Sequence, residues 1–201
     1  MKKLELDFYR RSDVLQVSRE LIGKLVVTKW NGVVTSGRIV ECEAYAGPMD
    51  KASHAAGGRR TNRTEIMYAE GGVAYVYLCY GIHHMFNVVT NQKDTPHAIL
   101  VRALEPVNGI DEMLLRTGKE KADYTLTRGP GNVCKALGIY TSHTGLSLRS
   151  RELFLADDRN GYSPAAIFTS PRIGVDYAGA DAALPYRFYV RGNPFVSGKP
   201  K

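Results

Sequence analysis

The first strong pattern along the chain is an amphipathic helix near its start. Ser12 is the expected N-cap of this helix, and Gly23 is expected to end it. The apolar positions that recur at near-helical spacing are Val14, Val17, Leu21 and Ile22.

Beyond this helix the hydrophobic pattern becomes that of strands. Six segments combine β-branched, aromatic and alternating residues between clusters of Gly, Asn, Asp and Pro: 24–29, 37–46, 73–80, 85–91, 97–104 and 187–191. Short helices are expected at 109–117 and 132–137, closed by Gly118 and Gly138. Strands and helices do not alternate strictly, and no repeat or linker divides the chain. We therefore predict an α+β protein, a single domain over residues 1–201 with a curved, mostly antiparallel β-sheet and flanking short helices.

Composition adds a class of partner to this picture. The 201 residues are 44% hydrophobic, which is sufficient for one packed core. Lys and Arg outnumber Asp and Glu by 27 to 20, which gives a net charge of +7. This excess favours a polyanionic partner, with nucleic acid first among the candidates, although many basic proteins bind no DNA.

Cysteine usage and hydropathy indicate the compartment. Cys42, Cys79 and Cys134 form no CxxC motif, so we expect reduced thiols and neither a disulfide framework nor a zinc site. The first eleven residues lack the apolar region of a secretory signal, and the apolar runs are too short to span a bilayer. We expect a cytoplasmic protein without membrane association, nucleoid-associated if the source is bacterial.

The segment 37–46 carries the first candidate chemistry. Alternation places its apolar residues Val40, Cys42 and Ala44 on one face. The other face then carries two carboxylates and a ring, from Ile39, Glu41, Glu43 and Tyr45. Two interpretations remain open for this strand. It has either the solvated face of a half-buried strand or a rigid pair of carboxylates for catalysis.

A loop rich in small residues and glycine follows this strand. His54 lies in it, where the backbone could approach a ligand closely, although a loop histidine is commonly just exposed. Arg59, Arg60 and Arg63 come next. They are either a phosphate-binding loop or ordinary solvated arginines.

Polar and aromatic residues also interrupt the next three strands. Tyr75 and Tyr77 suit core packing, whereas Tyr80 stands directly before a glycine at a strand end and is expected to be exposed. Asn87 and Arg102 are polar residues within apolar strands. Each either points outward or reaches into a cleft shared with the strand 37–46.

Taken together and in order, these segments resemble the alkyladenine (3-methyladenine) DNA glycosylase family. The segments are GRIVECEAYAGPMDKASHAAGG, YVYLCYGIHHMFNVV, ILVRALEP, GPGNVCKALGI and RFYVRGNPFVS. The resemblance extends from the first helix to about Ser197, and its most specific parts are EAYxGxxDxASH and YVYxxYG.

The resemblance implies roles for individual residues in catalysis and base binding. Glu43 is expected to activate the attacking water, and Arg102 to support that general base and the water near it. The expected walls of the base pocket are Tyr45, His54 and Tyr77.

It also implies how the protein recognises DNA and the damaged base. Asn87 would exclude guanine by a clash with its exocyclic amino group, and Tyr80 would enter the duplex. Two positions depart from the family pattern. Thr64 follows Arg63 where the family often has Asn, and Cys42 stands where other members carry Thr.

The implied reaction is hydrolysis of an N-glycosidic bond in double-stranded DNA containing damaged purines. A flipped alkylated purine leaves readily because it is cationic, whereas neutral hypoxanthine needs a proton, which His54 or a solvent path could supply. No lysine in these motifs is expected to be a Schiff-base nucleophile, so the product would be an intact abasic site. We expect a monomer with no cofactor and no metal.

Two rival functions remain. A non-catalytic binder of bent or damaged DNA would share the basic surface and the exposed tyrosine, but a carboxylate near phosphates would only weaken its binding. A hydrolase of free nucleosides would have no use for the arginine loop. The helix-hairpin-helix glycosylases are a poor match, since neither their iron–sulfur cysteine spacing nor their catalytic aspartate context is found.

Overall fold

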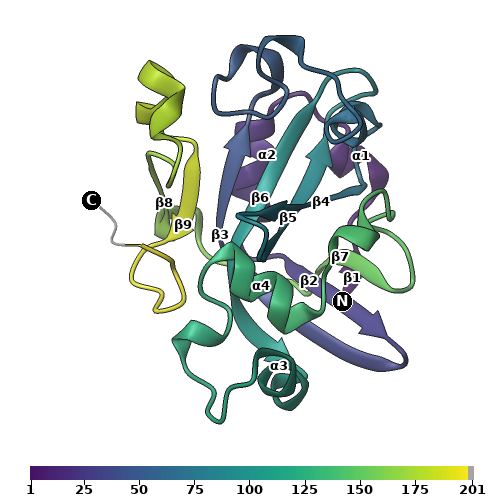
Figure 1. Cartoon of the computed structure of the whole chain (residues 1–201). Helices are drawn as coiled ribbons and strands as arrows, with labels where there is room; N and C mark the ends of the chain where they lie inside the picture. The colour runs from purple at the N-terminus through teal and green to yellow at the C-terminus, as the bar shows by residue number, and fades with distance from the viewer. Residues whose placement is uncertain (199–201) are drawn as a thin grey trace.

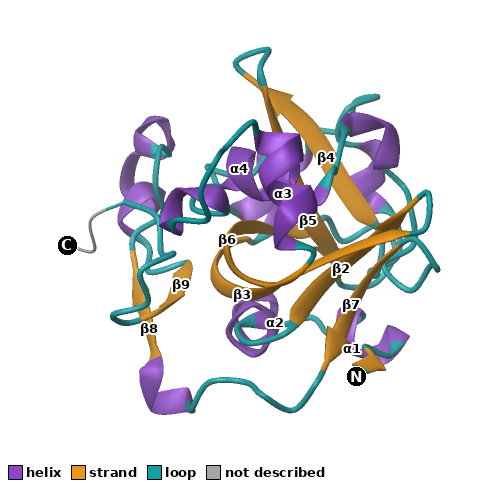
Figure 2. Ribbon diagram, turned by 90° about the horizontal axis from the view of Figure 1, so that it is seen from below, coloured by secondary structure: helices purple, strands orange, loops and turns teal. Residues whose placement is uncertain are grey.

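The computed structural model describes residues 1–198 as one antiparallel sheet with short helices on both of its faces. The sheet order is β1-β7-β2-β3-β6-β5-β4, and β8 and β9 form a side branch that pairs with β3. The strands are β1 (Lys2–Lys3), β2 (Leu25–Trp30), β3 (Val33–Tyr45), β4 (Ala74–Cys79), β5 (His83–Thr90), β6 (His97–Asn108), β7 (Leu153–Asp157), β8 (Ile167–Ser170) and β9 (Arg187–Val190). Figure 2 shows β3 and β6 bending strongly along their length. The predicted α+β class and curved antiparallel sheet are confirmed.

Four α-helices pack around this sheet. They are α1 (Leu6–Tyr9), α2 (Val14–Leu21), α3 (Ile110–Thr117) and α4 (Pro130–Leu137). Helices α3 and α4 lie over one face, and α2 lies over the other (Figure 2). Short 3₁₀ helices lie in the connections: η1 (Gly47–Met49), η2 (Ala56–Gly58), η3 (Glu65–Tyr68), η4 (Tyr124–Leu126), η5 (Thr141–His143), η6 (Pro164–Ala166) and η7 (Asp176–Ala183).

The three predicted helices are confirmed, with one correction at an N-cap. Asp13, not Ser12, caps α2, because its carboxylate accepts hydrogen bonds from the amides of Leu15 and Gln16, both at 3.0 Å. The two residues have similar capping preferences, so the local sequence could not separate them. Gly118 and Gly138 end α3 and α4 in the left-handed conformation, as expected.

The six predicted strands are confirmed, but β3 begins four residues earlier than expected, at Val33 instead of residue 37. Asn31 and Gly32, both with positive φ, form the tight turn of a β2–β3 hairpin, and backbone pairing extends both strands to it. Helix α1 and strands β1, β7 and β8 were not predicted. They are short, and three of them depend on distant pairing partners.

The strand β3 exchanges one neighbour for another along its length. Its first half pairs with β2, and its second half pairs with β9 through residues 41–43, while β6 stays on its other edge. The Cys42 thiol donates to the Ser18 carbonyl of α2 at 3.4 Å, so the predicted apolar face of β3 is buried and packs against α2. The opposite face carries the candidate site. Within residues 1–198 no helix combines the length and apolar character needed to cross a membrane.

Candidate functional site

A row of paired residues crosses the sheet on the face opposite α2. Glu43 on β3 pairs with Leu100 on β6. Leu100 pairs in turn with Asn87 on β5, which pairs with Tyr75 on β4. Residues opposite each other in antiparallel strands point to the same face. The sheet therefore presents a carboxylate, a leucine, an amide and a phenol in one row of about 14 Å.

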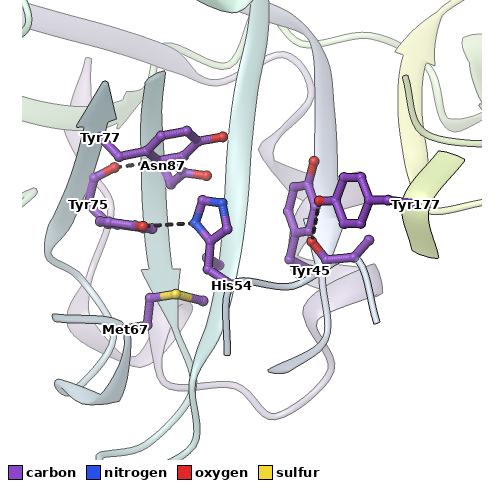
Figure 3. Close-up of a pocket in the computed structure, with 9 residues that line it drawn as sticks. Tyr45, His54, Met67, Tyr75, Tyr77, Asn87 and Tyr177 are labelled. Atoms are coloured by element: carbon purple, nitrogen blue, oxygen red, sulfur yellow. Dashed lines mark hydrogen bonds between the residues drawn. The ribbon is translucent and has the colours of Figure 1, made fainter. Parts of the chain in front are cut away.

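A pocket lies on this face of the sheet. Its lining residues are Tyr45, Ala52, His54, Met67, Tyr75, Tyr77, Asn87, Ala98 and Tyr177. In Figure 3, Tyr75 and Tyr77 lie on one side of His54, and Tyr45 and Tyr177 lie on the other. Tyr45, His54 and Tyr77, the expected walls of the base pocket, therefore line one cavity together with Asn87, the residue expected to exclude guanine. Its aromatic walls suit a planar heterocycle.

The side chain of Asn87 is held in one orientation. Its Nδ2 donates to the carbonyl oxygens of Tyr75 and Met85, both at 3.1 Å, and the residue is buried. Both partners are acceptors, so the amide nitrogen must face them. The remaining edge of the amide is a fixed part of the pocket wall.

His54 is a neutral member of the pocket at physiological pH. Its Nδ1 lies 2.9 Å from the hydroxyl of Tyr75, and its ring meets Tyr77 edge-on with centroids 4.7 Å apart. Burial, followed by the charges of Arg63 and Arg59, lowers the pKa of His54 to about 4. This low pKa argues against the expectation that His54 protonates a neutral lesion, because His54 carries a proton in few of the protein molecules near pH 7.

Glu43 is fully buried beside this pocket, with polar partners from β3, from β6 and from the connection between β8 and η7. Its Oε2 accepts from the Tyr45 hydroxyl at 3.0 Å and from Arg102 Nη1 at 3.2 Å, and its Oε1 accepts from the Ile173 amide at 2.7 Å. Burial and the charge of Glu43 raise the pKa of Tyr45 well above its usual value, so this phenol keeps the proton it donates. Glu41 is fully buried as well. The interpretation of a solvated face is therefore wrong for this strand.

Arg102 lies where the pairing of β3 with β6 is irregular. Cys42 pairs with Val101 and Glu41 pairs with Ala103, which leaves Arg102 as the extra residue of a β-bulge. Bulges change the direction of a side chain relative to the regular alternation. Burial opposes the charge of Arg102, but Glu43 and Glu41 raise its pKa above the usual value.

A groove lined by arginine adjoins the base pocket. Arg59 and Arg63 line the groove, which shares His54 and Tyr177 with the pocket. The Arg63 guanidinium also lies 4.9 Å from the centroid of the Tyr77 ring. Two exposed cations thus flank the entrance to an aromatic cavity.

Arg60, from the same loop, has acidic partners within the protein. It donates to both carboxylate oxygens of Glu65, at 2.8 and 2.7 Å, and to Asp94 at 2.8 Å. Its guanidinium also stacks on the ring of Tyr68. Of the three loop arginines, Arg60 is therefore the one whose charge is compensated by these carboxylates.

The exposed tyrosine expected at the strand end is present in the turn between β4 and β5. Tyr80 is 91% exposed and has a positive φ of 51°, followed by Gly81 at 73°. A tyrosine in the left-handed region is strained, which is unusual outside functional turns. The turn thus holds an aromatic ring away from the protein surface.

Comparisons with known proteins identify the family. The family model described as methylpurine-DNA glycosylase (MPG) matches residues 7–194. The chain belongs to the methylpurine-DNA glycosylase family. Proteins of Bacillus cereus (strain AH820) and Bacillus anthracis (strain A0248) are 48% identical over 200 residues, covering 96% of this chain and 97% of theirs. Each carries the name "Putative 3-methyladenine DNA glycosylase".

For this methylpurine-DNA glycosylase family member, sequence reasoning missed several residues of the pocket. Tyr75 was assigned to core packing, yet its position two residues before Tyr77 would have placed both on one strand face. Met67 lies in η3 and Tyr177 in η7, two 3₁₀ helices that no periodic pattern in the sequence indicated. Within residues 1–198 no three His, Cys, Asp or Glu side chains cluster in a way that could hold a metal ion.

Proposed function

We propose that this chain is a monofunctional glycosylase that acts as a monomer on double-stranded DNA. It flips an alkylated or deaminated purine into the aromatic pocket and hydrolyses the N-glycosidic bond with a water activated by Glu43. The product is an intact abasic site, the first intermediate of base excision repair.

One observation carries this proposal above the others. A fully buried carboxylate, Glu43, is bonded to Tyr45, which is itself a wall of the aromatic pocket. A base stacked on Tyr45 would place its sugar near the Glu43 carboxylate. A protein that only binds damaged DNA gains nothing from a buried anion at this position, whereas a hydrolase needs a base there.

Base flipping has an energetic cost that the protein can offset. Extruding a nucleotide costs a few kcal/mol, and less where damage has weakened the pair. Stacking on the tyrosine walls contributes about 1–3 kcal/mol per base. Tyr80, held outward at the β4–β5 turn, is positioned to fill the gap left in the duplex.

Departure of the purine generates positive charge on the sugar. In the mechanism of inverting glycosidases, a carboxylate takes a proton from a water on the opposite side of the sugar from the leaving group. Glu43 would serve as this base, and Arg102 and Tyr45 would keep its carboxylate oriented. A neutral His54 also favours an alkylated, cationic purine, because it adds no positive charge to the cavity.

The monofunctional assignment requires a test because one lysine, Lys51, lies near this site. It lines the arginine groove and not the base pocket, and its backbone amide donates to Asp181. A lysine that attacked the sugar would form a Schiff base that borohydride traps as a covalent protein–DNA adduct. We expect no such adduct.

The proposed activity is tested with duplexes that each carry one lesion. The set comprises 3-methyladenine, 7-methylguanine, hypoxanthine and ethenoadenine, and alkali treatment after incubation cleaves any abasic site that has formed. Strand breaks should appear only after alkali and only in lesion-containing duplexes. Tight binding without any abasic site would instead support the non-catalytic binder.

A further inference from the structure

Glu41 is the second carboxylate of β3, to which the resemblance assigns no role. It is fully buried, and its Oε1 accepts from Arg102 Nε at 3.0 Å, Arg187 Nε at 2.7 Å and Ser197 Oγ at 2.9 Å. Its Oε2 accepts from the Ser197 amide at 2.6 Å. Two guanidinium groups and the C-terminal segment thus converge on one buried anion.

This convergence determines the orientation of Arg102. A guanidinium is a rigid planar fork, so fixing two of its nitrogens fixes the third. Glu41 holds Nε, and Ser197 Oγ holds Nη2 at 3.2 Å. The third nitrogen, Nη1, is thereby directed to Glu43 at 3.2 Å. The backbone does not set this direction by pairing, because Arg102 is the unpaired residue of the bulge.

Glu41 also binds a second guanidinium, that of Arg187. Arg187 lies opposite Glu43 in the pairing of β9 with β3, yet its Nε bonds Glu41 and its Nη1 bonds Ser170 Oγ. The side chain of Arg187 is almost completely buried, so water cannot replace a lost partner. Without the charge of Glu41, Arg187 would lose its anionic partner and could turn to Glu43, which Arg102 already contacts.

We propose that Glu41 is a positioning residue for the glycosylase reaction. It holds Arg187 away from Glu43 and presents one N–H of Arg102 to it, so that Glu43 stays oriented and remains able to accept a proton from water. The inference rests on the proposed function of Glu43 as the general base.

The pH dependence of Glu43 reflects every charged or titratable group that faces it. Glu41 and Tyr45 belong to its own strand. From other elements come Arg102 on β6, Arg187 on β9, Tyr77 on β4, Arg172 between β8 and η7, and Tyr177 in η7.

The decisive variant is Glu41→Gln, which keeps the shape of the side chain and removes its charge. Loss of a neighbouring negative charge and release of Arg187 both favour the ionised form of Glu43 and weaken it as a base. In a plot of the single-turnover excision rate against pH, the acid limb should move to lower pH by about one unit. The plateau rate should fall about tenfold or more, while lesion-duplex affinity stays within several-fold of wild type.

Two further variants separate positioning from stability. Asp158→Asn breaks another Arg–carboxylate pair, in which Arg38 donates at 2.8 and 2.7 Å, and should leave the pH limb in place. Glu41→Asp restores the charge and should return the limb towards that of wild type. The proposal would be overturned if Glu41→Gln had the same acid limb of the pH–rate profile as wild type and the same plateau excision rate per folded molecule.

Failure of this inference can be distinguished from failure of the proposed function. Carbon-13 NMR of the Glu43 carboxyl reports its titration without any substrate, and the midpoint should fall in Glu41→Gln. If wild-type protein releases no base, the proposed function fails, and equal midpoints in the two proteins would refute the inference separately. If Glu41→Gln does not fold, Ser197→Ala removes the anchor of Arg102 Nη2 instead. That variant should lower the plateau at least about threefold, and an unchanged plateau would refute the positioning role.

Discussion

The hydroxyl of Tyr45 donates a hydrogen bond to Oε2 of Glu43 across 3.0 Å. The two residues are neighbours on one strand face, and Tyr45 is also a wall of the aromatic pocket. The group expected to stack on the base and the group expected to activate water are therefore directly connected. The proposed role of Glu43 as the general base is therefore the first to test.

Glu43→Gln should retain lesion-duplex affinity within several-fold and reduce single-turnover excision by at least about 10²-fold, the lower end for loss of a general base. The matched control is Glu105→Gln. Glu105 also accepts from a tyrosine hydroxyl, that of Tyr162 at 2.6 Å, but Tyr162 does not line the base pocket, whereas Tyr45 does. Near-wild-type excision by Glu43→Gln would remove this residue from the mechanism.

The low pKa of His54 predicts a specific pH dependence of stability. The native state keeps His54 neutral down to about pH 4, whereas the unfolded chain takes up this proton near pH 6.5. The unfolded state therefore binds more protons between these values, so the free energy of unfolding should decrease as pH falls from 6.5 to 4. His54→Gln should flatten this part of the curve in urea unfolding measured at a series of pH values. A His54 imidazole signal that titrates near pH 6.5 in NMR spectra would contradict the prediction.

Tyr80→Ala should weaken capture of the flipped state more than it weakens initial duplex binding. Because the Tyr80 side chain is 91% exposed, its removal should leave the melting temperature nearly unchanged. A fluorescent base next to the lesion reports unstacking directly. Tyr77→Ala is the comparison, since it should allow flipping and impair stacking in the pocket afterwards. Unchanged flipping amplitude and rate in Tyr80→Ala would exclude the wedge role.

Replacing Arg59 or Arg63 should weaken binding to damaged and undamaged duplexes alike. Each phosphate contact that is lost should reduce the salt slope of log K by about 0.9, because fewer counterions are released. Arg60→Ala is the matched control from the same loop. Its charge is already paired with Glu65 and Asp94, so we expect a smaller change in slope. Equal slopes for all three variants and wild type would place the phosphate contacts elsewhere.

Asn87→Ser should increase excision of guanine-type bases relative to adenine-type lesions. The shorter side chain opens space at the purine edge, and selection by a clash disappears when the clashing group is removed. The measurement is the ratio of excision rates for the two base types in identical flanking sequence. A fall in overall activity with an unchanged ratio would show that Asn87 supports the pocket without selecting the base.

Local patterns in the sequence were sufficient for most of the elements. The helical spacing that starts at Val14, the glycines that end α3 and α4, and the strand-forming segments each depend on residues within a few positions. The order of the motifs was sufficient to recognise the family. The exposure of Tyr80 also followed from its immediate context, a tyrosine directly before a glycine at a strand end.

The burial of the carboxylates could not be predicted in this way. Alternation along β3 shows which residues share a face but not what covers that face. The cover over Glu41 comes from Arg187 and Ser197, which lie 146 and 156 positions further along the chain. Whether a face is solvated or buried depends on such long-range packing, so a solvated strand and a catalytic one look alike in sequence.

The sequence by itself determined which residue types are present and, through their short-range spacing, the strands and turns that carry them. Only the tertiary structure decided their chemical state. The β-bulge at Arg102, the anchored amide of Asn87 and the neutral imidazole of His54 each depend on register, partners or burial. The physical reason is that solvation and the electrostatic field at a group are set by every element packed around it, and these elements meet only in the folded chain.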